Sequence, residues 1–208
     1  MITKESFSSA FARISSLMHA NRAELVRLDQ VNGDGDLGIS MDDGFQAVAA
    51  FFADEAPEDL GQALRQASKV MNSSAPSSLG TILAFGLMGM AKDLRGKSEI
   101  TLSELASAID SGVANIMEKA ESKPGEKTIL DALAPGASEL VKAAEAGESA
   151  NVKEALTAAA AAARAGSEST KNMRAVHGRA AYSAERSVGI LDGGSVAGAL
   201  IFEGIAGE

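Results

Sequence analysis

The sequence predicts an all-helical fold in a single domain covering residues 1–208. Apolar residues recur at steps of three and four along most of the chain, and no apolar–polar alternation of convincing length is present. Hydrophobic residues make up 46% of the chain but aromatic residues only 4%, so the core must be built mainly from Ala, Leu, Ile, Val and Met. Such small and aliphatic side chains suit closely packed helices. About eight helices and no sheet are expected.

The first predicted helix spans residues 3–27. Phe7, Phe11, Ile14 and Met18 fall on one of its faces, and later segments repeat this pattern. The following helices are expected over residues 41–53, 58–72, 77–94, 101–121, 128–146, 151–166 and 193–206, with a further one near 168–176.

Local signals support several of these boundaries. Thr101 and Glu104 form a capping-box pattern, and Asn151 with Glu154 opens a helix that continues into an alanine-rich run. The four prolines are expected between periodic segments or at their ends, where helices break. They are Pro57, Pro76, Pro124 and Pro135.

Charge and cysteine content exclude several classes of function. The net charge of −9 argues against general nucleic-acid binding and against binding to an anionic membrane surface. The absence of cysteine rules out disulfides and thiolate metal sites. The polar N-terminal segment does not resemble a signal peptide, and no stretch has the length of a membrane span. A cytoplasmic location is expected.

The densest polar signal lies between the first two helices, over residues 28–40. Asp29, Asp34 and Asp36 place three carboxylates within eight residues, where they repel one another unless a cation lies among them. Oxygen ligands without His or Cys favour magnesium or calcium over zinc. Glycines allow sharp turns and close approach of a ligand; they are Gly33, Gly35 and Gly38. We expect a hard-cation site here.

Ser40 is expected to be the N-cap of the second helix, with Asp43 three residues on. The free amides of that helix would face the loop and could accept a phosphate. Two alternatives are a solvated acidic turn and an EF-hand calcium loop. The EF-hand pattern is imperfect, because its sixth position is Leu37 instead of Gly and its twelfth is Asp43 instead of Glu. Its first, third, fifth and seventh positions would be Asn32, Asp34, Asp36 and Gly38.

Four segments in series resemble the signatures of the dihydroxyacetone kinase L family. The first is the aspartate loop, Leu-Asp-x-x-x-Gly-Asp-Gly-Asp-x-Gly, and the second is Ser-Ser-Ala-Pro-Ser-Ser-Leu-Gly-Thr at residues 73–81. Residues 125–135 read Gly-Glu-Lys-Thr-Ile-Leu-Asp-Ala-Leu-Ala-Pro. Residues 178–194 read Gly-Arg-Ala-Ala-Tyr-Ser-Ala-Glu-Arg-Ser-Val-Gly-Ile-Leu-Asp-Gly-Gly. Order, spacing and residue type agree over nearly the whole chain.

This resemblance implies an eight-helix antiparallel barrel that binds ADP or ATP on the loops at one end. Asp29, Asp34 and Asp36 would coordinate two magnesium ions that bridge the phosphates. No catalytic residue is assigned beyond this metal site. The residues implied to contact the nucleotide are Leu37, Gly38, Ile39, Ser40, Ser74, Ala75, Pro76, Ser77, Ser78, Gly125, Arg179, Asp192, Gly193 and Gly194.

The charges of such a site balance only when metal is included. ADP contributes about −3 and the three aspartates −3, whereas two magnesium ions supply +4. The remainder, about −2, is within reach of one or two basic groups such as Arg179. Lys127, His177, Glu185 and Arg186 are open candidates for ligand contact.

The resemblance also implies a divided enzyme. The family's ketose is held by a separate K subunit, so this chain is expected to act as a kinase only with such a partner. The acceptor would be dihydroxyacetone or another short ketose such as erythrulose. Leu37 stands where the family commonly has His in members recharged by a phosphotransferase-system protein and Cys in members using free ATP, which leaves the donor open. The alternatives are a non-catalytic nucleotide-binding regulatory module and an ADP-releasing phosphatase.

Overall fold

The computed structural model describes the chain except for residues 32, 146, 148–150 and 208 and the side chains of residues 179, 183, 184 and 186. The described residues form eight α-helices, namely α1 (Lys4–Gln30), α2 (Leu37–Asp54), α3 (Leu60–Ser74), α4 (Ser78–Asp93), α5 (Leu102–Ala120), α6 (Leu130–Ala144), α7 (Val152–Ser169) and α8 (Gly193–Ala206). Two 3-10 segments, η2 (Thr170–Asn172) and η3 (Arg179–Ser187), and two short strands, β1 (Ile2–Thr3) and β2 (Glu99–Ile100), complete the list.

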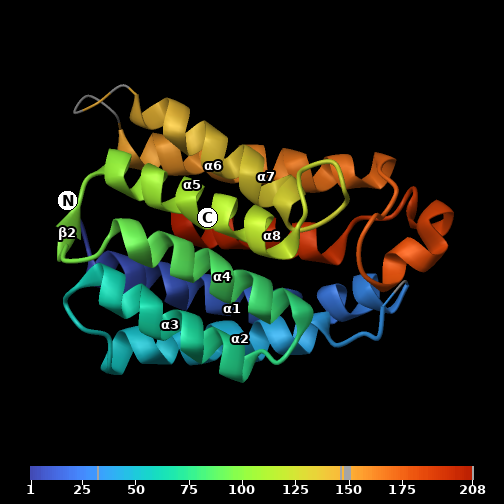
Figure 1. The fold of residues 1–208 in the computed structure, drawn as a ribbon, viewed down its shortest axis with the longest axis horizontal. Coiled ribbons are helices and arrows are strands. Elements are labelled where there is room, and N and C mark those ends of the chain that lie inside the picture. Colours follow the sequence, from blue (N-terminus) through green and yellow to red (C-terminus); the bar gives the residue numbers. More distant parts are fainter. Residues whose placement is uncertain (32, 146, 148–150, 208) are drawn as a thin grey trace.

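The helices form a closed up-and-down ring. Each packs against the next along the chain, and α8 returns to pack against α1 (Figure 1). The eight-helix antiparallel barrel is therefore confirmed. Because successive helices alternate in direction, the connections 31–36, 75–77, 121–129 and 170–192 all lie at one end, on the right of Figure 1. We call this the loop end. All four sequence signatures lie there.

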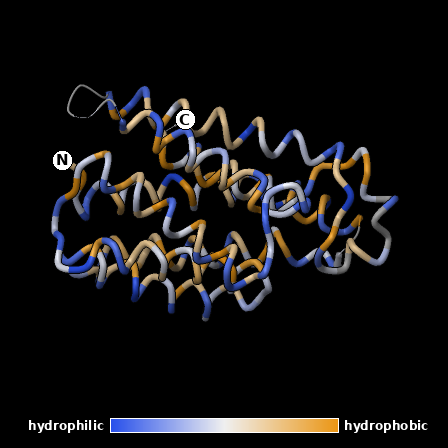
Figure 2. The backbone as a smooth tube through the Cα atoms, turned by 45° about the horizontal axis from the view of Figure 1, so that its top comes forward, coloured by the Kyte–Doolittle hydropathy of each residue, from blue (hydrophilic) through white to orange (hydrophobic). Residues whose placement is uncertain are grey.

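The apolar faces predicted from periodicity form the core. Phe7, Phe11, Ile14 and Met18 are all buried, and the ring of Phe11 stacks on that of Phe52 with centroids 4.7 Å apart. Orange and blue positions alternate along the helices in Figure 2, as expected of helices that bury one face.

Small residues let some helices come into near backbone contact. A Cβ built on Gly112 of α5 would lie 2.9 Å from the carbonyl oxygen of Gly86 on α4. An apolar cavity of about 570 Å³ nevertheless lies inside the barrel, lined by residues including Phe45, Leu83 and Phe202. None of the three loop aspartates lines it.

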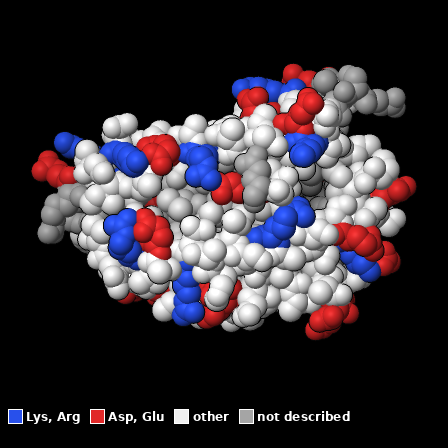
Figure 3. Space-filling view, turned by 180° about the vertical axis from the view of Figure 1, so that it is seen from behind, with Lys and Arg blue, Asp and Glu red and all other residues white. Residues whose placement is uncertain are grey.

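Helix starts follow the expected capping chemistry at several positions. Thr101 and Glu104 form the predicted capping box at α5, and the Asn151 side chain accepts the amides of Lys153 and Glu154 at α7. Within the described residues, no helix combines the length and apolar character needed to cross a bilayer. Lys and Arg are interspersed with Asp and Glu on the face shown in Figure 3, without gathering into one basic surface there.

Several predictions about secondary structure were wrong in detail. A small sheet exists, because Ile2 pairs with Ile100 and Thr3 with Glu99 in an antiparallel ladder too short to show periodicity. The helix expected near 168–176 ends early, since α7 stops at Ser169 and η2 at Asn172. The helix expected from 41 begins at Leu37.

Pro135 lies inside α6 instead of at a helix end. A proline has no N–H to donate, so the carbonyl four residues earlier, that of Asp131, loses its helical partner. A Cβ built on Gly166 of α7 would lie only 2.0 Å from that oxygen. The glycine thus lets α7 approach α6 closely where the proline interrupts the hydrogen-bond ladder.

Candidate metal and phosphate site

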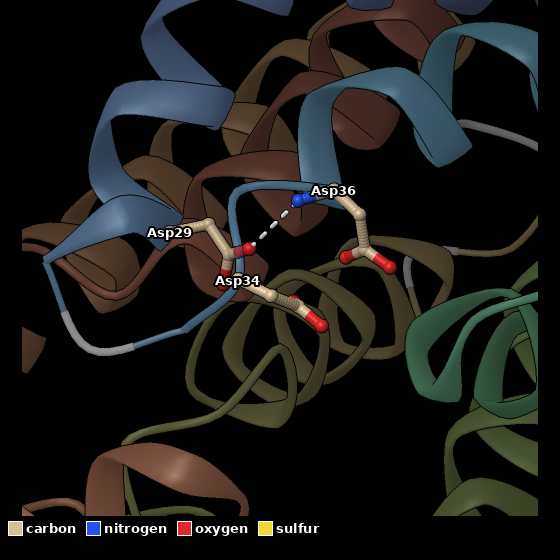
Figure 4. Close-up of side chains that lie close together, drawn as sticks. All are labelled: Asp29, Asp34 and Asp36. Atoms are coloured by element: carbon tan, nitrogen blue, oxygen red, sulfur yellow. Dashed lines mark hydrogen bonds between the residues drawn. The ribbon is translucent and has the colours of Figure 1, made fainter.

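The three predicted aspartates converge in the loop between α1 and α2. Asp29 lies in the last turn of α1, Asp34 in the loop, and Asp36 at the N-cap of α2. Each offers a carboxylate oxygen, and these oxygens lie within 4.8 Å of one another (Figure 4). Asp29 is half-buried, whereas Asp34 and Asp36 are exposed. The donor set contains only hard oxygens, which fits magnesium or calcium.

Asp29 also organises the loop. Its Oδ2 accepts hydrogen bonds from the amides of Gly35 at 2.7 Å and Asp36 at 3.1 Å. Gly35 has a φ of +79°, and a Cβ on Gly33 would lie 2.2 Å from Asp29 Oδ1. Larger residues at these glycines would therefore displace the carboxylate or strain the backbone.

The start of α2 differs from the prediction. Asp36, not Ser40, occupies the N-cap, and the buried Ser40 hydroxyl donates to the carbonyl oxygen of Leu37 at 3.2 Å. The helix can begin earlier because Gly38 tolerates close contact: a Cβ there would lie 2.2 Å from the Arg22 carbonyl oxygen. The early start of α2 also argues against an EF-hand calcium loop. The last seven positions of that loop, residues 37–43, are helical here.

The four residues after Asp36 differ in their exposure to solvent. The Leu37 side chain is buried, and a Cβ on Gly193 would lie 2.6 Å from its Cδ2. Gly38 is buried against α1, whereas Ile39 is exposed. The side chains of Leu37 and Ser40 are therefore packed inside the protein beneath the loop. The expected contact of these two residues with a nucleotide stays a prediction.

An open groove of about 680 Å³ adjoins the aspartate loop. Its lining includes Asp36, the α3–α4 connection through Pro76 and Ser77, and Lys119 of α5. Ser77 is the N-cap of α4 and accepts the Gly80 amide at 3.1 Å. The groove also contains Ser78, the first residue of α4, whose amide precedes the first intrahelical hydrogen bond.

The predicted Ser74 and Ala75 lie just before this groove. Ser74 ends α3 and is half-buried, whereas Ala75 is the buried C-cap. A Cβ on Gly80 would lie 2.0 Å from the Ala75 carbonyl oxygen, so the turn between the two helices is tight. Negative charge beside a helix N-terminus is favourable, and the groove has the chemistry of a phosphate site.

The glycines and aspartate expected at the nucleoside occupy two other loops of the same end. Gly125, with a φ of +93°, donates its amide to Asp131 Oδ1 at 2.5 Å. Asp192 is the N-cap of α8 and accepts the Ser195 amide at 2.6 Å. Burial raises the pKa of the Asp192 carboxyl to about 6. Gly193 and Gly194 follow as the first residues of α8.

Comparison with known proteins identifies the family. The DAK2 domain matches residues 31–207. The chain belongs to the DAK2 domain family. It is 29% identical over 183 residues to the PEP-dependent dihydroxyacetone kinase, ADP-binding subunit DhaL, of Escherichia coli (strain K12), covering 88% of this chain and 86% of that one.

Two further relatives are larger than this chain. It is 30% identical over 205 residues to the L-erythrulose kinase of Pectobacterium atrosepticum, covering 96% of this chain and 34% of that protein. The crystal structure of the dihydroxyacetone kinase from C. freundii in complex with AMP-PNP and Mg2+ matches with a TM-score of 0.74 and 21% identity. That match covers 96% of this chain and 33% of the other, and it establishes the fold.

The connection between α7 and α8 is hydrogen-bonded to the α5–α6 loop of this DAK2 domain. The buried Lys127 donates through Nζ to the carbonyl oxygens of Thr170 and Ile190, both at 2.6 Å. His177 Nε2 lies 2.6 Å from Glu126 Oε2. The His177 ring lowers the pKa of the Glu126 carboxyl. Lys127 therefore links these loops by hydrogen bonds and is not among the residues that line the groove.

Other residues singled out in the sequence have less defined roles. The exposed Glu185 lies 3.7 Å from Arg174 in a surface ion pair. The side chains of Arg179 and Arg186 lie outside the described part of the structure. The expected contact of Arg179 with the nucleotide therefore stays a prediction.

Sequence reasoning missed two residues of the loop end. Lys119 lines the groove, and Asp131 is buried while accepting the amides of Gly125 and Thr128. The signal for Lys119 was available, because alternating helices bring the end of the predicted helix 101–121 to the same end as the aspartate loop. Asp131 belonged to a recognised motif, but its contacts depend on how the loop folds back.

Proposed function

We propose that this chain is the nucleotide-binding subunit of a dihydroxyacetone-type kinase. It holds ADP or ATP through magnesium and supports phosphoryl transfer to dihydroxyacetone or a related short ketose on a separate K-type subunit. The observation that carries the proposal is the convergence of Asp29, Asp34 and Asp36 beside a groove with a helix N-terminus. The names of the relatives, an ADP-binding subunit and an L-erythrulose kinase, support it.

The charges of the site favour a metal-bridged ligand. Three carboxylates and a nucleoside diphosphate together carry a charge of about −6. Without cations between them, the carboxylates would repel the nucleotide. Asp29, Asp34 and Asp36 would hold the magnesium, and we propose two ions. Bound magnesium would neutralise charge on the transferring phosphoryl group, while the protein chiefly positions it.

The remaining groups would position the nucleotide. The start of α4, with Ser77 and Ser78, offers amides and hydroxyls to phosphate oxygens. Gly125 and the turn at Asp192 to Gly194 would lie along the nucleoside. The glycines at these turns leave room for close approach by a ligand.

The loop end also suits docking of a partner that carries the acceptor. Donor and acceptor must be held in line at near contact for phosphoryl transfer. Among the described residues, five of the seven exposed large hydrophobics belong to connections or helix starts at this end. They are Val31, Ile39, Val176, Tyr182 and Val188.

A binding experiment tests the nucleotide site directly. Calorimetric titration of ADP with and without magnesium should give binding only when the metal is present. Asp34→Asn should weaken ADP binding at least as much as it weakens magnesium binding, because the metal links two acidic partners. Asp43→Asn, an exposed aspartate on α2 outside the cluster, is the matched control. Undiminished ADP affinity in chelator would refute the metal bridge.

A second experiment tests the kinase assignment. The chain alone should not phosphorylate a ketose, whereas addition of a co-encoded K-type subunit should give turnover. Comparison of ATP with a phosphotransferase-system donor protein would identify the phosphoryl source. Nucleotide binding without turnover with every such subunit would instead identify a non-catalytic regulatory module. Turnover by the purified chain alone would contradict the divided-enzyme proposal.

A further inference from the structure

Lys119 gives the groove beside the aspartate loop a cationic side. The groove lining includes Asp36 from the loop, Ser77 and Ser78 at the start of α4, and Lys119 with Ala120 at the end of α5. Residues that carry hydroxyls, a carboxylate and an ammonium group therefore line one open space. A ligand with several anionic oxygens, which can use metal at one point and a cation at another, matches this combination.

The position of Lys119 is otherwise unfavourable for an anion. It lies in the last turn of α5, where the helix presents carbonyl oxygens and a partial negative charge. The ammonium group offsets this charge on the side of the groove. Its present partner is the neighbouring Glu118, with Nζ 2.8 Å from Oε1.

The pair with Glu118 does not fix the lysine. Both side chains are largely exposed, at 49% and 70%, and ion pairs of this kind contribute little free energy. Lys119 can therefore exchange a solvated carboxylate for a better-placed phosphate without losing a buried interaction. Its four-carbon stem gives it the reach to do so.

We propose that Lys119 binds the phosphates of the nucleotide, which lie in the groove between the aspartate loop and the end of α5. This inference rests on the proposed function and adds a residue that determines affinity for the polyphosphate group. ADP, the three aspartates and two magnesium ions together leave a net charge of about −2 at the site. Lys119 supplies one positive charge that offsets it. Losing a hydrogen bond to a charged group corresponds to roughly a tenfold or greater loss of affinity.

The test is a calorimetric titration of wild type, Lys119→Gln and Lys119→Arg with ADP and with inorganic pyrophosphate, all with magnesium. The matched control is Lys142→Gln, because Lys142 is also an exposed last-turn lysine paired with a glutamate, but on α6, which ends away from the loop end. We expect Lys119→Gln to weaken both ligands about tenfold or more, Lys119→Arg to retain most of the affinity, and Lys142→Gln to match wild type. Added salt should also weaken ADP binding less in Lys119→Gln than in wild type.

The alternative outcomes separate the explanations. Unchanged ADP affinity in Lys119→Gln with a lowered melting temperature would overturn the inference and show that the lysine only stabilises the end of α5. Weakened ADP binding with unchanged pyrophosphate binding would also overturn it, because the contact would then be to the nucleoside. If wild type binds no ADP with magnesium, the proposed function itself fails. If wild type binds ADP with magnesium and Lys119→Gln binds it equally well, only the proposed role of Lys119 fails.

Discussion

Lys127 Nζ donates a hydrogen bond to the main-chain carbonyl oxygen of Ile190 at 2.6 Å, across 63 positions of the chain. The same amine donates to the Thr170 carbonyl oxygen. One buried cation thus joins the α5–α6 loop, the end of α7 and the segment before α8. Lys127 has a left-handed φ of +60°, a conformation uncommon for residues other than glycine, so these contacts must hold the backbone in place.

Lys127→Met should destabilise the fold by about 3 kcal/mol, because two carbonyl oxygens lose hydrogen bonds to a charged group at roughly 1.5 kcal/mol each. Urea denaturation followed by circular dichroism measures the change. Lys123→Met, an exposed lysine in the same loop, is the control and should change the unfolding free energy by less than about 0.5 kcal/mol. Equal stability of the two variants would show that water replaces the amine at these carbonyls.

Asp29→Ala should loosen the aspartate loop, whereas Asp34→Ala should not. Asp29 accepts the amides of Gly35 and Asp36, so its removal leaves both donors without that acceptor. Hydrogen exchange in metal-free protein should show faster exchange at these two amides in Asp29→Ala only. Both variants should nevertheless lose magnesium affinity. Equal exchange at the two amides in both variants would contradict the anchoring role of Asp29.

Gly38→Ala should destabilise the protein by roughly 1–3 kcal/mol, the usual cost of inserting a carbon into a packed contact. The new Cβ would lie 2.2 Å from the Arg22 carbonyl oxygen, so the backbones of α1 and α2 must separate. Chemical denaturation measures this loss. Ile39→Ala, at the exposed neighbouring position, should have a much smaller effect. A stable Gly38→Ala variant would indicate that α2 shifts easily along α1.

The sequence predicted the helices and the aspartate cluster because both leave strong local patterns, whereas the barrel arrangement of the helices was implied by the family resemblance. Phe7, Phe11, Ile14 and Met18 repeat with helical spacing, and three aspartates crowd one short loop. The early start of α2 was not predictable in this way. It depends on contact between Gly38 and α1, and the polar Ser40 gave a stronger local capping signal than Asp36.

Contacts between distant segments account for the other differences. Lys127 could be read as a phosphate ligand because nothing local reveals that Thr170 and Ile190 present carbonyl oxygens to it. Pro135 lies inside α6, and Gly166 of α7 approaches the carbonyl oxygen of Asp131 that the proline leaves without its helical partner. Such tertiary relations override local propensity, and a single sequence does not display them.

In metal-free protein, the Asp192 carboxyl should contribute stability that is lost as pH rises from about 4 through about 6. Burial raises the pKa of this carboxyl to about 6 from an ordinary value of 3.8. In that window the folded state therefore binds the proton more tightly than the unfolded state, so raising the pH favours unfolding. Well above pH 6 the Asp192 carboxyl is ionised in both states, and this contribution becomes constant.

Asp192→Asn isolates the contribution of Asp192, because the asparagine cannot ionise but can still accept the Ser195 amide as an N-cap. Other groups titrate in the same window, so the quantity to measure is the difference in unfolding free energy between variant and wild type at a series of pH values. The variant should gain stability relative to wild type between pH 4 and 6, and the gain should then level off. A difference that is constant from pH 4 to 7 would mean that the folded protein leaves the Asp192 carboxylate well solvated, with no penalty for its charge.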